Sequence, residues 1–329
     1  ACLNSFPPIA PSSPSTTPQQ ISTLLRKMGF LALALISTSA AALDPTVRLY
    51  NNVEMPMMGA GTWQYDSETA FNSVVSALKL GYTHIDTANN YGNQDGVGRA
   101  LAGRNRSSYF LTTKIPGCKV NPLNPGACYN DAHKALAQDM SLLGVDYVDL
   151  MLVHFPPLVG GCGGQNCKAM QAQWRAVEEM YKNKTARAIG VSNFCESCFE
   201  CLNSTQTVLP MVNQVAYHIG MGPDPEGLFS YAKKLGVVMQ AYSPLGNGSP
   251  DLIHGDLTTA IGAKYNKSSV QVALKWVAQH GIPLLTKSTS EQYLAEDLAI
   301  FDFELSQEDM AKLDAQTSPS GRPSFTCKA

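Results

Sequence analysis

Three short apolar runs in this sequence each stop at an ionisable side chain. Asp86, Lys114 and His154 close these runs, and Tyr91 follows Asp86 by five residues. Continuous apolar runs are typical of buried parallel strands, and the carboxyl ends of such strands meet at one rim of a closed barrel. We therefore expect these side chains to gather at one site.

A tyrosine placed beside a lysine and a carboxylate can donate a proton to a carbonyl oxygen. A phenol titrates near pH ~10, and a neighbouring ammonium group favours the phenolate and lowers that pKa. We expect Asp86 to hold Lys114, Tyr91 to donate and take back the proton, and His154 to donate a second hydrogen bond that orients the carbonyl. No side chain supplies hydride, so this chemistry implies a nicotinamide coenzyme. Taken singly, the same residues also fit a rim ion pair and a loop histidine.

The elements that must position these side chains alternate between apolar and amphipathic segments. Residues 46–53 predict a hairpin that turns at Asn51-Asn52, because asparagine tolerates the left-handed conformation. The apolar segments that follow predict strands at 57–63, up to 86, 110–114, 147–153, 186–191, 212–215, 237–241 and 282–285. Helical spacing predicts helices at 67–80, 130–143, 170–181, 195–203, 225–235, 270–279, 290–300 and 306–315.

This alternation predicts a (β/α)8 TIM barrel with an N-terminal β-hairpin, which forms one catalytic domain over residues 44–329. A doubly wound open sheet is the alternative. It would require a G-x-G-x-x-G fingerprint that opens a helix after the first strand, and residues 59–63 read GAGTW instead.

The amino-acid composition excludes some classes of binding partner for this protein. The chain has 329 residues, 44% hydrophobic content and a net charge of -2, which fits a globular domain with a sizeable core. The chain has few charged residues, and they give no sign of nucleic-acid binding. No apolar run is long enough to span a bilayer. We expect a small-molecule substrate and a monomer, with no nucleic-acid or membrane partner once a leader is removed.

The N-terminal segment has the composition of a leader. Residues 1–20 hold five prolines, and Arg26-Lys27 precede an apolar run at 28–36 and small residues at 37–42. A basic flank, a short apolar core and a small-residue site predict a secretory signal peptide, cleaved near Ala42. We expect residues 1–43 to be a disordered segment and signal peptide, and the protein to enter the secretory pathway or be extracellular. The alternatives are an apolar helix of the domain, an initiator at Met28, and a cytoplasmic protein.

Cysteine usage fits an oxidising compartment, because eight cysteines follow the leader. Cys118 with Cys128, and Cys162 with Cys167, flank loops rich in Gly or Pro, and we predict both pairs to be disulfides. For the other cysteines the spacing does not choose partners: Cys195, Cys198, Cys201 and Cys327. No second pair stands at zinc-finger spacing, so no metal is expected, and free thiols in a cytosolic enzyme are the alternative. Acceptor sequons occur at Asn105, Asn183, Asn203, Asn247 and Asn266.

Many short segments, in this order, resemble the aldo-keto reductase superfamily. The resemblance runs from about Val47 to about Gly321. The matching segments are Gly61-Thr62-Trp63, Asp86-Thr87-Ala88 with Tyr91 and Asn93, Lys114, residues 152–156 (LVHFP), residues 190–194 (GVSNF), Asn213-Gln214, residues 242–246 (YSPLG), Lys287-Ser288 and residues 301–305 (FDFEL).

The resemblance implies a barrel that reduces aldehydes and ketones with NADPH. It implies Tyr91 as the proton donor, Lys114 and Asp86 as the residues that tune it, and His154 as the residue that orients the substrate. The implied substrate pocket consists of Trp63, Tyr91, His154 and Phe155, with Tyr65 nearby. The implied coenzyme site consists of Gly61, Thr62, Trp63, Asp86, Ser192, Asn193, Gln214, Tyr242, Ser243, Leu245, Lys287 and Ser288.

The sequence departs from the family pattern at two positions after Lys287-Ser288. Tyr293 stands where the pattern has an arginine for the 2'-phosphate, and Asp297 stands where it has an asparagine near the adenine. Loss of a planar, bidentate donor weakens phosphate recognition, although Lys287 can still pair with the phosphate. We therefore expect NADP, with NAD as the alternative. A cofactor-binding regulatory protein with little turnover is the alternative function.

Overall fold

The computed structural model describes residues 45–119, 121, 124–157 and 161–324. The predicted leader and Cys327 lie outside these residues. Residues Asp44–Ala329 form one compact unit.

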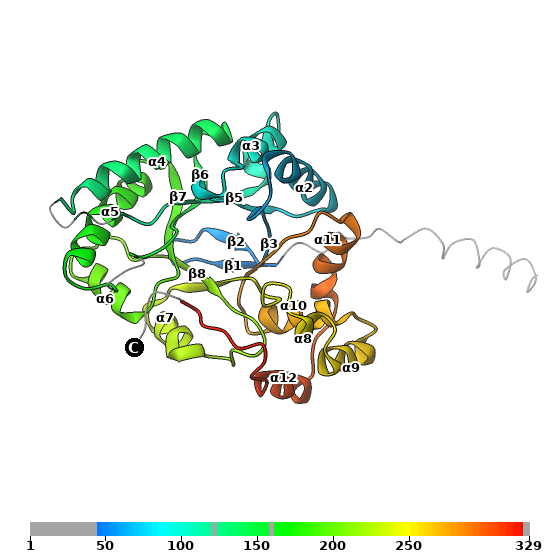
Figure 1. Cartoon of the computed structure of the whole chain (residues 1–329). Coiled ribbons are helices and arrows are strands. Elements are labelled where there is room, and N and C mark those ends of the chain that lie inside the picture. The colour runs from blue at the N-terminus through cyan, green and yellow to red at the C-terminus, as the bar shows by residue number, and fades with distance from the viewer. Residues whose placement is uncertain (1–44, 120, 122–123, 158–160, 325–329) are drawn as a thin grey trace, which may run out of the picture. The chain divides into compact units, whose positions relative to one another are not determined.

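A closed barrel of eight parallel strands forms the centre of this unit, and helices surround it (Figure 1). The strands run in the order β10-β3-β4-β5-β6-β7-β8-β9 around the barrel. Their bounds are β3 Met58–Gly61, β4 His84–Asp86, β5 Phe110–Ile115, β6 Val148–Val153, β7 Ala186–Ser192, β8 Val212–Ala216, β9 Val238–Tyr242 and β10 Leu284–Thr286. The predicted fold class is confirmed.

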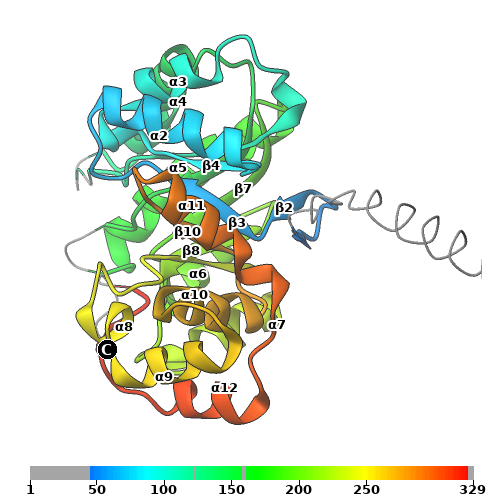
Figure 2. The same ribbon diagram turned by 90° about the vertical axis from the view of Figure 1, so that its right-hand side faces the viewer.

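The N-terminal hairpin lies at the end of the barrel opposite to the carboxyl ends of the strands. β1 (Thr46–Arg48) pairs antiparallel with β2 (Glu54–Pro56), and Asn52 turns the hairpin with a φ of 66°. The hairpin leads directly into the amino end of β3, and Leu49 and Met55 are buried. Figures 1 and 2 show it in the middle of the ring of helices, beyond one end of the strands. The opposite end of the barrel is therefore the one left open for a site.

Local sequence accounts for the helices that were predicted. α2 (Ser67–Leu80) begins where the Asp66 side chain accepts from Thr69 N at 2.7 Å, and it ends at Gly81, whose φ is 107°. The other large helices are α4 Ala127–Leu143, α5 Gly164–Lys182, α6 Glu196–Asn203, α7 Leu228–Leu235, α10 Ser269–Gln279, α11 Glu291–Leu298 and α12 Gln307–Asp314. Residues 225–235 were predicted as one helix, but Glu226, with a φ of 57°, and Gly227, with a φ of 70°, break it into a 3-10 turn (Pro225–Gly227) and α7.

Three helices were not predicted: α3 Gln94–Leu101, α8 Pro250–Ile253 and α9 Asp256–Tyr265. The sequence did not predict α3 because this segment contains glycines, and glycine is a weak helix former. In the structure these glycines allow close packing. A Cβ on Gly96 would clash with the carbonyl group of Ser67, and a Cβ on Gly98 would clash with that of Leu142.

Disulfides tie together loops and helices at the carboxyl end of the barrel. Cys118 and Cys128 form a bridge with a Cα–Cα distance of 5.5 Å, as predicted. The predicted Cys162–Cys167 bridge is wrong, because Cys162 pairs with Cys198 at 5.0 Å and Cys167 pairs with Cys201 at 5.6 Å.

Helical geometry explains this error. Cys198 and Cys201 are three residues apart on α6, so they share one helix face. That face meets Cys162, which precedes α5, and Cys167 in the first turn of α5. The sulfurs of Cys162, Cys195 and Cys198 lie within 4.8 Å of one another. A disulfide uses two of them, so this group offers no set of thiolate ligands. Among the described residues, no helix is both long enough and apolar enough to cross a membrane.

Candidate active site

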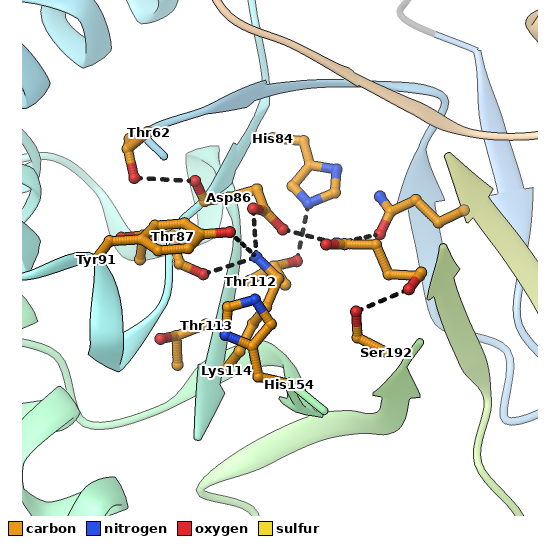
Figure 3. Close-up of polar contacts among 12 residues, drawn as sticks. Thr62, His84, Asp86, Thr87, Tyr91, Thr112, Thr113, Lys114, His154 and Ser192 are labelled. Carbon is orange, nitrogen blue, oxygen red and sulfur yellow. Dashed lines mark hydrogen bonds and ion pairs between the residues drawn. The ribbon is translucent and has the colours of Figure 1, made fainter. Parts of the chain in front are cut away.

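Tyr91, Lys114 and Asp86 form a buried chain of polar contacts at the carboxyl end of the barrel (Figure 3). Asp86 ends β4, Lys114 stands near the end of β5, and Tyr91 ends the 3-10 turn η1 (Asn89–Tyr91). Lys114 Nζ lies 2.5 Å from Asp86 Oδ1 and 3.3 Å from the Tyr91 hydroxyl, and it donates to the carbonyl oxygen of Thr87 at 3.0 Å. The lysine therefore joins the carboxylate to the phenol, as the sequence predicted.

Burial and neighbouring charges together determine the protonation states of Lys114 and Tyr91. Burial disfavours the Lys114 ammonium, but Asp86 and Tyr91 outweigh it, so the pKa of Lys114 is raised. For Tyr91, the sequence led us to expect a lowered pKa. In the structure, burial raises the pKa of Tyr91 by more than Lys114 lowers it. Tyr91 is therefore a neutral phenol at neutral pH, with its proton available for donation.

His154 lies directly after β6 and faces Tyr91. The two rings meet edge to face with centroids 5.5 Å apart, and Phe155 stacks on the imidazole at 4.3 Å. Burial, with a contribution from Lys114, lowers the pKa of His154 to about 2. A neutral imidazole carries one N–H group. His154 therefore faces a substrate as a neutral ring throughout the physiological pH range.

The residues expected to hold a nicotinamide carboxamide lie at the ends of the next strands. Ser192 Oγ donates to the carbonyl oxygen of Gln214 at 2.7 Å, and Gln214 Nε2 donates to Asp86 Oδ2 at 2.9 Å. Asn193 Nδ2 donates to the carbonyl oxygen of His154 at 3.1 Å, and the Tyr242 hydroxyl donates to Asn193 Oδ1 at 2.8 Å. The structure thus connects these residues to both Asp86 and His154.

This donor set fits a nicotinamide. Amide and hydroxyl groups complement a carboxamide, and the half-buried ring of Tyr242 offers a stacking face beside them. On the rim, Lys287 Nζ donates to the carbonyl oxygen of Trp63 at 3.0 Å and to Gln64 Oε1 at 3.1 Å. Its side chain is exposed at this rim.

The remaining predicted coenzyme residues lie at the end of β3 and in the loops that follow β3, β9 and β10. Thr62 is buried and donates its backbone N–H to the carbonyl oxygen of Asp86 at 3.1 Å, so it joins β3 to β4. Trp63 is 48% exposed at the mouth. Gly61 ends β3, Ser243 donates its Oγ to Asn247 Oδ1 at 2.7 Å, Ser288 Oγ accepts from Ser290 N at 3.0 Å, and Leu245 is half-buried.

The two positions that depart from the family pattern differ in burial. Tyr293 is 59% exposed on the first turn of α11, while Asp297 is buried on the last turn. Burial raises the pKa of Asp297 to about 7, against the opposing effect of a hydrogen bond with Thr286. At neutral pH the Asp297 carboxyl group is therefore only partly ionised, and its charge is weaker than the sequence suggested.

Sequence reasoning missed two neighbours of Tyr91. His154 Nδ1 donates to Asn90 Oδ1 at 2.7 Å, and Asn89 Nδ2 donates to Asp139 Oδ1 on α4 at 2.6 Å. Burial raises the pKa of Asp139 to about 6. The signal in the sequence was the Asn-Asn pair that precedes Tyr91, but its contacts depend on β6 and α4, which are distant in the chain.

Comparison with known proteins agrees with this geometry. The model of the Aldo/keto reductase family matches residues 57–251 and 254–317. Glyoxal reductase of Bacillus subtilis (strain 168) is 39% identical over 277 residues, which cover 83% of this chain and 93% of that protein. Morphine 6-dehydrogenase of Pseudomonas putida is 33% identical over 287 residues, which cover 83% and 92%. The crystal structure of an aldo-keto reductase from a Medee basin deep-sea metagenome library has a TM-score of 0.76 and 32% identity, and the match covers 87% of this chain and 100% of that one.

Proposed function

We propose that this chain, which belongs to the aldo/keto reductase family, reduces a small aldehyde or ketone to the alcohol with NADPH as its coenzyme. The observation that carries the proposal is the chain of contacts from Asp86 through Lys114 to Tyr91, at 2.5 and 3.3 Å. When bound, the nicotinamide supplies the hydride that no side chain can supply.

The side chains of this site hold and deliver the proton. Tyr91 keeps it on the phenol oxygen, because burial raises the pKa of Tyr91, and donates it to the carbonyl oxygen as negative charge develops there. Lys114 then stabilises the phenolate, and Asp86 keeps Lys114 against it. His154 and Phe155 border the same space and orient the carbonyl group.

The coenzyme and the substrate are proposed from separate observations. Lys287 is a cation beside the expected phosphate site, which favours NADP, whereas Tyr293 offers no bidentate donor there. The substrate class follows from relatives that are named for glyoxal reduction and morphine oxidation. We propose small reactive aldehydes and dicarbonyls as the first compounds to test.

A monomer of the secretory pathway is proposed as the native context. The three disulfides between described residues support an oxidising compartment. The sequon asparagines are all exposed, which a glycosylated surface requires: Asn105, Asn183, Asn203, Asn247 and Asn266.

The experiment that tests the function follows the nicotinamide absorbance with glyoxal, methylglyoxal and an aromatic aldehyde, with NADPH and NADH in parallel. Tyr91→Phe keeps the ring and removes the acid, so turnover should fall by about 10²–10⁴-fold while coenzyme binding is retained. A variant that keeps more than about half of the wild-type rate would exclude Tyr91 as the acid. Wild-type protein that binds coenzyme without turnover on any carbonyl would support a regulatory protein instead.

A further inference from the structure

Asn90 contacts the Nδ1 atom of the His154 ring. It belongs to the same 3-10 turn as Tyr91, and its Oδ1 accepts from His154 Nδ1 at 2.7 Å. The side chain of Asn90 is exposed at the mouth of the site. Nothing in the proton-donating chain of Tyr91, Lys114 and Asp86 requires it.

The contact decides which nitrogen of His154 carries the hydrogen. A neutral imidazole has one N–H group, and the hydrogen bond at one nitrogen sets the state of the other. With the amide oxygen of Asn90 facing it, Nδ1 keeps the hydrogen and Nε2 presents a lone pair; with the amide NH2 group facing it, Nδ1 accepts and Nε2 keeps the hydrogen. Among the described residues, Nε2 of His154 has no hydrogen-bond partner, and it is not one of the fully buried polar atoms that lack one. Nε2 is therefore accessible to a ligand.

A carbonyl oxygen can only accept a hydrogen bond, so His154 can orient it only with a hydrogen on Nε2. A half-turn of the Asn90 amide exchanges its oxygen for its NH2 group, which then donates to Nδ1. The imidazole loses its hydrogen from Nδ1 to water and gains one from water on Nε2. An amide supports both states, whereas a carboxylate or an aliphatic side chain cannot.

We propose that Asn90 is a positioning residue that sets the orientation and the tautomer of His154, so that Nε2–H meets the substrate carbonyl. The inference rests on the proposed carbonyl reduction. It adds a residue that acts through His154 and does not itself touch the reacting atoms.

The first test compares Asn90→Leu and Asn90→Asp, which are both close in size to asparagine and lie on an exposed position. Asn90→Leu leaves Nδ1 without a partner, and we expect kcat/KM to fall about 10-fold or more, towards the 10²–10³-fold typical of losing one such donor. Asn90→Asp holds the neutral ring with its hydrogen on Nδ1, and we expect a similar loss at neutral pH.

The pH dependence of Asn90→Asp gives the sharper readout. The charged group that acts on His154 is Lys114, from β5, which is paired with Asp86, while Tyr91 faces the ring as a neutral phenol. A carboxylate at position 90 would raise the pKa of His154. The imidazolium carries hydrogens on both nitrogens, so activity of the variant should rise as the pH is lowered from about 8 to 5, and we expect no such rise for the wild type.

Asn89→Leu is the matched control, because Asn89 lies in the same turn but its amide contacts Asp139 and not His154. We expect this variant to keep the wild-type pH dependence. Equal losses in Asn89→Leu and Asn90→Leu, with no acid-favoured limb in Asn90→Asp, would show that only the integrity of the turn matters and would overturn the proposal.

A readout without turnover separates this inference from the proposed function. Long-range 1H–15N NMR of the histidine side chains reports which ring nitrogen is protonated, and His154→Gln assigns the signal. We expect His154 to change its tautomer ratio in Asn90→Asp and Asn90→Leu but not in Asn89→Leu. An unchanged ratio in the Asn90 variants would overturn the inference, even if the wild-type enzyme reduces carbonyls as proposed.

Discussion

At the scale of single residues, the ion pair of Lys114 affects stability, and in the proposed mechanism Lys114 also acts in catalysis. Its side chain is fully buried, and its Nζ pairs with Asp86, which is also buried. Removing one partner of a buried ion pair leaves the other charge uncompensated, at a cost of about 3–5 kcal/mol. Replacing both partners with neutral residues of similar shape removes that penalty.

We therefore predict that Lys114→Met lowers the free energy of unfolding by about 3–5 kcal/mol, and that Lys114→Met with Asp86→Asn recovers most of it. Urea unfolding of both variants provides the measurement. Neither variant should recover turnover, because the phenolate of Tyr91 loses its stabilising cation in both. If activity returned together with stability, Lys114 would have only a structural role.

The gathering of Asp86, Lys114 and His154 at one site was predictable, because the carboxyl ends of strands in a barrel converge. The direction of the Tyr91 pKa was not, because the sequence shows Lys114 as a neighbour but does not show how deeply the phenol is buried. Asn90 was overlooked for a related reason. Its partner His154 is 64 residues away in the chain, and only the closed barrel brings them together.

At the scale of elements, α11 carries both departures from the family pattern. Tyr293→Arg introduces a planar donor at an exposed position on its first turn. We predict that it tightens NADP binding by about 1.5–3 kcal/mol relative to NAD, as expected for a hydrogen bond between charged groups. Equilibrium titration with both coenzymes measures the difference. Equal effects on both would show that this side chain does not reach the 2'-phosphate.

Asp297 makes the stability of this helix depend on pH. Because burial raises its pKa from 3.8 to about 7, the folded state binds the proton more tightly than the unfolded state. Its contribution to stability is complete below pH 3.8 and is lost as the pH rises through about 7. We predict that Asp297→Asn unfolds with a free energy a few kcal/mol higher than wild type at pH 9, and with little difference at pH 4.

Glu296→Gln is the control for this experiment, since it removes the adjacent acidic group, which is less buried. A difference between wild type and Asp297→Asn that did not change between pH 4 and 9 would contradict a raised pKa at position 297.

The elements also show where sequence patterns stop being informative. α2 was predicted with its observed bounds, because its cap at Asp66 and its terminal Gly81 are local signals. α3 was missed because its glycines weaken the local preference for a helix, and tertiary contacts with Ser67 and Leu142 stabilise it instead. The predicted Cys162–Cys167 pair failed in the same way, since the actual pairing depends on how α5 and α6 pack.

At the scale of the whole molecule, the disulfides and the exposed sequons lead to one prediction about the mature protein. Protein secreted from eukaryotic cells should carry N-linked glycans and no free thiols at the bridged cysteines. Intact mass measured before and after deglycosylation, with and without reduction, tests both. A homogeneous unmodified mass, with cysteines that can be alkylated without reduction, would instead support the alternative of a cytosolic protein.

The pairing of Cys162 with Cys198 and of Cys167 with Cys201 also changes what a cut in the backbone would do. Both bridges span the stretch from α5 to the start of α6, which includes β7 and Ser192. A protease that cleaves once between residues 168 and 197 would leave two polypeptides joined twice by covalent bonds. Such a nicked molecule would migrate as a single species until it is reduced, and its catalytic strands would stay in one particle. In a compartment rich in proteases, this part of the barrel would therefore stay covalently joined after its backbone had been cut.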